Sequence, residues 1–200
     1  MPTPDPAARR REVIAAGHRD DPASARAGLT DADASVRAAA IGALERLGRL
    51  EPGDLDAALV DASVTVRRRA IEACAGRPGD APPSLLAALG DPDATIVEVA
   101  AWASGERQPP EAGVVRKLAE LATDHPDALV REAAVAALGA VGDEAGRAAI
   151  LAALADKATV RRRAVLALAP FDGPDVEAAL AAALEDRDWQ VRQAAEDLSR

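Results

Sequence analysis

Aromatic residues are almost missing from this 200-residue chain, which contains two Trp, one Phe and no Tyr. Hydrophobic residues nevertheless make up 49% of the sequence, so the interior must be built from Ala, Leu, Val and Ile. Small aliphatic side chains of this kind suit helices that pack closely against one another.

Cysteine, histidine and lysine are also scarce. Cys74 is the only cysteine, which excludes an intrachain disulfide, and we expect it to be a small buried hydrophobic residue. The two histidines, His18 and His125, fit no zinc-ligand spacing, and no Gly-rich phosphate loop or Ser-His-Asp pattern stands out. We therefore expect no catalytic residues, no metal site and no cofactor.

Long apolar runs are missing as well. None approaches the ~20 residues that a membrane helix needs, and the N-terminal sequence lacks the apolar stretch of a secretory signal. The expectation is a soluble, cytoplasmic monomer without a membrane partner. The net charge of −9 argues against general affinity for nucleic acid, because that affinity depends on Lys and Arg neutralising phosphates.

A repeat of about 30 residues is the main feature that the sequence does have. Each copy contains an Asp-rich turn, an aliphatic anchor usually followed by Arg, and then alanines and aliphatic residues at helical spacing. The anchors lie 30, 30, 34, 30 and 31 residues apart: Val36, Val66, Ile96, Val130, Val160 and Val191. A fixed period in this range predicts stacked helix pairs.

The second helix of each pair starts near its anchor. If positions are counted from the anchor as 0, positions 0, +4, +7 and +8 form the apolar stripe of this helix. The first helix lies before the Asp turn, including one predicted from Leu85. The predicted fold is all-α, a right-handed α-α superhelix of about six helix pairs with an N-terminal capping helix. Residues 1–20 would form the tail and capping helix, at about residues 6–17, and residues 21–200 a single solenoid domain. Glu196 replaces an apolar residue at +5, as a terminal repeat requires.

These units resemble HEAT repeats, in particular the short HEAT-like repeats of the phycobilisome bilin lyases. The Asp turns and the Val-Arg pairs at 36–37, 66–67, 130–131, 160–161 and 191–192 carry the resemblance. The family includes scaffolds, bilin lyases, a di-iron hydroxylase and DNA-alkylation glycosylases on related repeats, so the fold does not choose the function. Two histidines are too few for the di-iron ligands.

The recurrent arginines at +1 have two interpretations. They could form a row that binds anions, or they could contact the recurring Asp residues and tie each turn to the neighbouring helix. The regular acidic partner favours the second interpretation. The third unit has Val97 at this position instead of Arg.

Position +2 and position +6 lie on the side of the second helix that the resemblance assigns to the concave surface. Trp102 falls on this side, where Trp is a typical binding anchor; the alternative is that Trp102 folds over the loop at Pro109 and Pro110. Trp189, just before the last anchor, is interpreted as a packing residue. The predicted partner-binding residues are Arg68, Arg69, Glu72, Glu98, Trp102, Glu132 and Arg162.

The function predicted from these features is a non-catalytic scaffold or adaptor that binds a protein partner through its concave face. One alternative is a DNA-binding protein related to the alkylpurine glycosylases, for which Trp102 and Glu106 are weak support. A bilin-lyase-like protein and a designed consensus array are further alternatives. The irregular third unit argues against the designed array.

Overall fold

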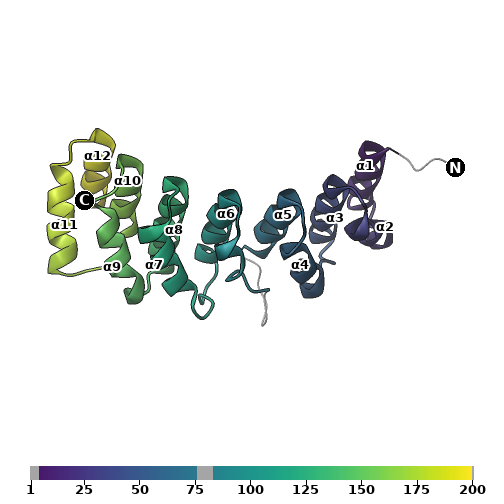
Figure 1. The fold of residues 1–200 in the computed structure, drawn as a ribbon, viewed down its shortest axis with the longest axis horizontal. Helices are drawn as coiled ribbons and strands as arrows, with labels where there is room; N and C mark the ends of the chain where they lie inside the picture. Colours follow the sequence, from purple (N-terminus) through teal and green to yellow (C-terminus); the bar gives the residue numbers. More distant parts are fainter. Residues whose placement is uncertain (1–4, 76–82, 200) are drawn as a thin grey trace. The chain divides into compact units, whose positions relative to one another are not determined.

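The computed structural model describes residues 5–75 and 83–199. Over these residues all regular structure is helical, with 12 α-helices and two short 3-10 helices (Figure 1). The chain is an all-α repeat solenoid, as predicted. It divides into two compact units, Met1–Ser84 and Leu85–Arg200, each with its own packed helices. That residues 21–200 form one solenoid domain stays a prediction.

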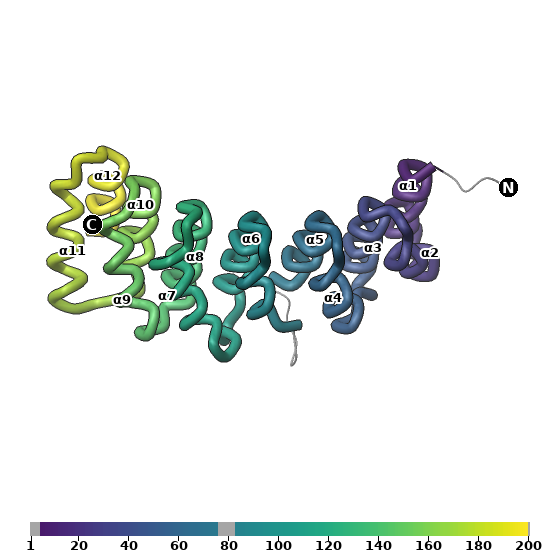
Figure 2. Tube along the Cα trace, in the orientation of Figure 1, coloured from purple at the N-terminus to yellow at the C-terminus, as the bar shows by residue number. Residues whose placement is uncertain are grey.

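Unit 1 (Met1–Ser84) contains two helix pairs preceded by a single helix. Three helices lie side by side in one layer: α1 (Pro6–Ala16), α3 (Ala34–Arg46) and α5 (Val64–Cys74). The other layer contains α2 (Pro22–Ala27), the 3-10 helix η1 (Gly28–Thr30) and α4 (Pro52–Leu59). Helices α2 and α4 pack against α3 and α5, and α1 begins and ends where the capping helix was predicted (Figure 2).

Unit 2 (Leu85–Arg200) has the same two-layer arrangement. One layer consists of α6 (Ala94–Gly105), α8 (Ala128–Val141), α10 (Ala158–Ala167) and α12 (Trp189–Leu198). The other contains the 3-10 helix η2 (Ala88–Gly90), α7 (Val114–Asp124), α9 (Glu144–Ala153) and α11 (Pro174–Leu184). Neighbouring second helices contact each other directly, so each repeat completes the core of the next.

The helix starts follow from the Asp-rich turns. In α3, α6, α8 and α12 the side chain of the N-cap Asp accepts a hydrogen bond from the backbone N–H two residues later. Such a bond satisfies one of the N–H groups that the first turn of a helix leaves unpaired. The N-cap residues are Asp33, Asp93, Asp127 and Asp188.

The predicted apolar stripe of the second helices lies in the core, together with buried residues of the first helices such as Leu55, Leu118 and Ile150. All six anchors are at most 2% exposed, and the Ala at +4 in each second helix is fully buried. Small residues are required because the helices approach closely. A Cβ atom added at Gly139 of α8 would lie 2.6 Å from the Cα of Ala167 in α10. Cys74 is fully buried, as predicted.

The predicted helix from Leu85 is wrong. The chain there forms a turn followed by η2, so the third repeat has no α-helix between Pro83 and Asp93. Pro83 lies before this segment, and Gly90 and Asp91 end it, which leaves too few residues for a stable α-helix. The loop at Pro109 and Pro110 is present after α6 and runs from Glu106 to Gly113.

Candidate functional site

The +1 arginines form a row of internal contacts, as the second interpretation predicted. Arg161 of α10 donates from Nε and Nη2 to the two carboxylate oxygens of Asp186, at 2.8 Å each. Its Nη1 also donates to the carbonyl oxygen of Asp156 at 2.8 Å. Arg37, Arg131 and Arg161 each join their own turn to a carboxylate of the following repeat, so their charges are used inside the fold.

The same Arg–Asp contacts lower the pKa values of Asp side chains in the turns. Hydrogen bonds from the arginine side chains lower the pKa values of Asp61, Asp156 and Asp186, against a smaller opposing effect of burial. At the start of unit 1, Arg9 of α1 bonds to Asp31, and with the backbone N–H of Asp33 it lowers the pKa of Asp31 to about 2. Helix α1 thus supplies the first member of the row.

The Arg–Asp pair that would join the third repeat to the fourth is replaced at both positions. Val97 replaces the arginine and is 2% exposed. His125 occupies the place of the acceptor carboxylate, two residues before the N-cap Asp127. Its Nδ1 accepts a hydrogen bond from the backbone N–H of Asp127 at 3.1 Å, as the Asp carboxylates do in other turns. The arginine and its carboxylate are therefore replaced together, by Val97 and His125.

The exposed side of the second helices in unit 2 carries four of the predicted binding residues. Trp102 on α6 is 47% exposed, so about half of this large side chain is accessible to solvent. Leu166, at the same repeat position on α10, is 36% exposed. We call this side, with positions +2 and +6 of each repeat, the second-helix face.

Charged residues lie at position +2 of the same helices. Glu98 and Glu132 are partly exposed and Arg162 is exposed. Glu132 accepts a hydrogen bond from Arg163 of α10 at 3.5 Å, which joins α8 to α10 at the surface. The second-helix face of unit 2 therefore combines two exposed apolar side chains with acidic and basic neighbours.

Unit 1 carries the other three predicted residues, all on α5. Arg68 is exposed, whereas Arg69 is partly buried and pairs with Glu45 of α3 and, at 3.5 Å, with Glu72. The structure thus brings Arg69 and Glu72 into contact. The seven predicted residues form two groups, one in each unit.

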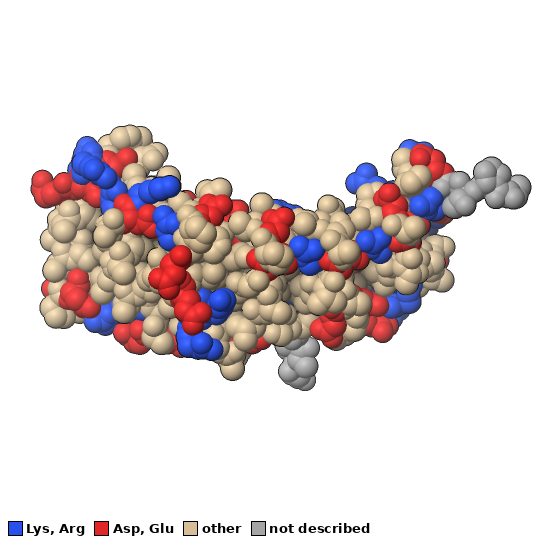
Figure 3. All heavy atoms as spheres, viewed as in Figure 1, with Lys and Arg blue, Asp and Glu red and all other residues tan. Residues whose placement is uncertain are grey.

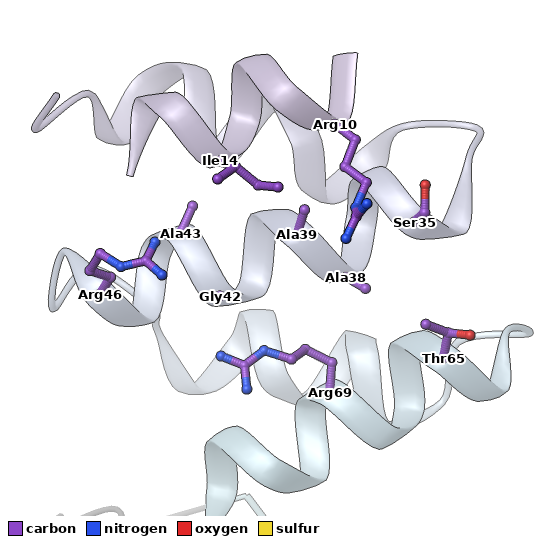
Figure 4. Close-up of a pocket in the computed structure, with 10 residues that line it drawn as sticks. All are labelled: Arg10, Ile14, Ser35, Ala38, Ala39, Gly42, Ala43, Arg46, Thr65 and Arg69. Atoms are coloured by element: carbon purple, nitrogen blue, oxygen red, sulfur yellow. The ribbon is translucent and has the colours of Figure 1, made fainter. Parts of the chain in front are cut away.

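Sequence reasoning missed a cavity of about 390 Å³ in unit 1 between α1, α3 and α5 (Figure 4). Arg10, Arg46 and Arg69 line it above a floor of small residues on α3. A signal for Arg10 exists in the sequence: the segment from Ala8 to Arg11 matches the Val-Arg-Arg-Arg segments that start at residues 66 and 160. Arg10 is therefore equivalent to Arg68 and Arg162. No repeat signal marks Arg46.

The interpretation of Trp189 as a packing residue is wrong, since this side chain is 64% exposed at the first position of α12. The same position in the other repeats is held by small residues that are partly exposed. Neighbouring residues at this helix position can partly bury a small side chain, but they leave most of an indole exposed. The equivalent residues are Ala34, Val64, Ala94, Ala128 and Ala158.

Charges of both signs are interspersed on the side of each unit that Figure 3 shows. Among residues 5–75 and 83–199, no group of three or more His, Cys, Asp or Glu side chains is placed to hold a metal ion. None of the helices in this described part of the chain has both the length and the hydropathy of a membrane span.

Helix pairs that repeat about every 30 residues, joined by Asp turns and Arg–Asp contacts, define a helical repeat solenoid. The family model for HEAT repeats matches residues 52–139, 82–162 and 115–198, and the chain belongs to this family. The predicted family is therefore confirmed. Comparison with curated proteins gave no match.

Among solved structures, the chain is similar to designed armadillo repeat proteins. One is the designed armadillo repeat protein YIII(Dq.V1)4CPAF in complex with peptide (KR)4, with 17% identity, a TM-score of 0.43 and coverage of 95% of this chain and 85% of that chain. Another, YIII(Dq)4CqI, has 16% identity, a TM-score of 0.42 and coverage of 94% and 85%. An engineered protein has 18% identity, a TM-score of 0.39 and coverage of 94% and 82%. Likeness at this level says nothing about what the present chain binds.

Proposed function

We propose that this chain is a non-catalytic protein-interaction module that binds a protein partner through its second-helix face. The observation that carries the proposal is Trp102, a large apolar side chain that is 47% exposed on α6. Leaving an indole in water forfeits the free energy of its burial, and a protein partner would recover it. HEAT repeats typically serve as rigid binding surfaces, which supports this assignment.

The surroundings of Trp102 support a protein partner. Leu166 adds a second exposed apolar side chain on the same face, with the small Ala136 at the equivalent position of α8. Protein interfaces combine such an apolar centre with a polar rim. In this proposal Glu98, Glu132 and Arg162 form the rim in unit 2.

In unit 1 the proposed contacts are Arg68, Arg69 and Glu72. Arginine is enriched at binding hot spots because its planar guanidinium makes several hydrogen bonds and also stacks on flat groups. Arg69 is held by Glu45 and Glu72, so little side-chain entropy would be lost when a partner binds it.

The test is affinity capture of partners from a source lysate, with wild type compared with Trp102→Ala and Arg69→Glu by quantitative mass spectrometry. Trp189→Ala is the matched control, because it removes the other exposed indole, which is not among the proposed contacts. Circular dichroism verifies that every variant keeps its helices.

The expected result is a protein that wild type and Trp189→Ala retain and that Trp102→Ala loses. Loss of a hot-spot Trp typically costs 2 kcal/mol or more, about thirtyfold in affinity. Retention by both Trp102→Ala and Arg69→Glu would refute the site. Recovery of nucleic acid in place of protein would refute the function.

A further inference from the structure

The cavity in unit 1 is an open groove whose floor is one side of α3. Its floor residues are small, namely Ala38, Ala39, Gly42 and Ala43. With no long side chain on the floor, a bound segment can lie close to the helix. Ile14 of α1 adds an apolar contact on one wall.

Three arginines surround this floor and come from three helices. Figure 4 shows Arg10 of α1 and Arg46 of α3 toward opposite ends of the groove, with Arg69 reaching in from α5. No acidic residue lines the groove. The arrangement places positive charge at three separate points along one shallow depression.

The charges of Arg10 and Arg46 are available for a ligand. Both side chains are exposed, and within the described residues neither makes a hydrogen bond or an ion pair. Arg69 differs because it pairs with Glu45 and Glu72. Even with these two acids counted, the groove keeps a positive charge on a chain whose net charge is −9.

Gly42 keeps the floor open and Arg69 in place. A Cβ atom at residue 42 would lie 3.2 Å from Nη2 and 3.3 Å from Nε of Arg69. A longer side chain there would fill the groove and displace the guanidinium. Glycine inside a helix lowers stability by about 0.5–1 kcal/mol relative to alanine, so its presence at this position needs a packing reason.

We propose that this groove binds an acidic segment of a protein partner, with carboxylates paired to Arg10, Arg46 and Arg69. The inference rests on the proposed function and specifies the chemistry of the partner in unit 1. Separate guanidinium groups match separate carboxylates along an extended peptide. A long polyanion such as nucleic acid would meet the acidic remainder of the surface as well, which weakens its binding.

The test uses the full chain and fluorescein-labelled octapeptides in fluorescence anisotropy. The probe alternates Glu and Ala, and the comparison peptide alternates Lys and Ala. The variants Arg10→Glu and Arg46→Glu reverse charge at residues without internal partners. Gly42→Leu fills the floor and keeps all three arginines. Arg11→Glu is the matched control, because Arg11 is exposed on the same helix but does not line the groove.

The Glu peptide is expected to bind and the Lys peptide not to bind. Arg10→Glu and Arg46→Glu should each weaken binding about tenfold, since a hydrogen bond to a charged group contributes about that much. Gly42→Leu should weaken it similarly at unchanged charge, and Arg11→Glu should change it by less than about twofold.

Four results would overturn the inference. Equal weakening by Arg11→Glu would show diffuse attraction instead of a groove. Tighter binding of single-stranded DNA or inorganic phosphate at the same residues would assign the groove to phosphate. A dimer that Arg10→Glu dissociates would assign it to a second copy of the chain. If the Glu peptide fails to bind while partner capture still depends on Trp102, the inference fails and the proposed function stands.

Discussion

Arg37 and Asp61 join two consecutive repeats of unit 1 through a bidentate contact. Nε and Nη2 of Arg37 donate to the two carboxylate oxygens of Asp61 at 2.8 Å each. Nη1 of the same arginine donates to the carbonyl oxygens of Asp31 and Ala32 at 2.8 and 3.1 Å. One side chain therefore fixes its own turn and the next one, so the charge of Arg37 is used to hold two repeats together.

Replacing Arg161 with alanine should lower the free energy of unfolding by about 2–4 kcal/mol. Arg161 is 6% exposed, and its loss leaves the carboxylate of Asp186 and the carbonyl of Asp156 without their donor. Thermal unfolding followed by circular dichroism measures the effect. Arg162→Ala, one residue further and exposed, is the control and should change stability by less than about 0.5 kcal/mol. Equal effects of the two substitutions would contradict the role of the +1 row.

Introducing an Arg–Asp pair at residues 97 and 125 should show that these two positions are energetically coupled. Val97→Arg alone buries a guanidinium without a carboxylate and should destabilise unit 2, while His125→Asp alone leaves a carboxylate without a guanidinium. The double variant should recover at least about 1 kcal/mol of the summed loss. A double-mutant cycle in urea measures this coupling. Strict additivity would show that the two positions do not form the repeat pair.

Stability should fall in acid as Asp31 is protonated. Because Arg9 and the N–H of Asp33 lower the pKa of Asp31 from 3.8 to about 2, the stabilising contribution is fully present above pH 4. It is lost as the pH falls from about 4 toward about 2. Denaturant midpoints of wild type and Arg9→Gln, measured across this range, check the prediction. The difference between the two proteins should shrink as the pH falls, and a constant difference would contradict it.

Gly139→Ala should destabilise unit 2 although alanine favours helices. The added Cβ would lie 2.6 Å from the Cα of Ala167, which forces α8 and α10 apart and costs about 1–3 kcal/mol. Gly53→Ala is the matched control, because nothing lies within 4 Å of its added Cβ in α4. The control should be neutral or stabilising by up to about 1 kcal/mol. The thermal midpoint of Gly139→Ala should therefore fall, whereas that of Gly53→Ala should stay unchanged or rise.

The binding residues were harder to predict than the fold. Trp102 stands out in sequence because no other repeat has an aromatic residue at the equivalent position, and the structure exposes it. The exposure of Trp189 was not predicted. How deeply the first residue of a helix is buried depends on how much of its side chain the neighbouring helices cover. Arg46 carries no repeat signal, since it lies beyond the part of the second helix that recurs from repeat to repeat.

The repeat period, the helix starts and the buried stripe follow from the sequence by itself, because Asp caps and helical spacing act over a few residues. Where each Arg finds its carboxylate was decided by tertiary structure: the partner is in the following repeat, 24 residues away for Arg37. The arginine groove was decided in the same way, since α1, α3 and α5 must pack side by side before Arg10, Arg46 and Arg69 surround one floor. Local patterns specify helices, whereas a surface shared by three helices depends on how closely they pack.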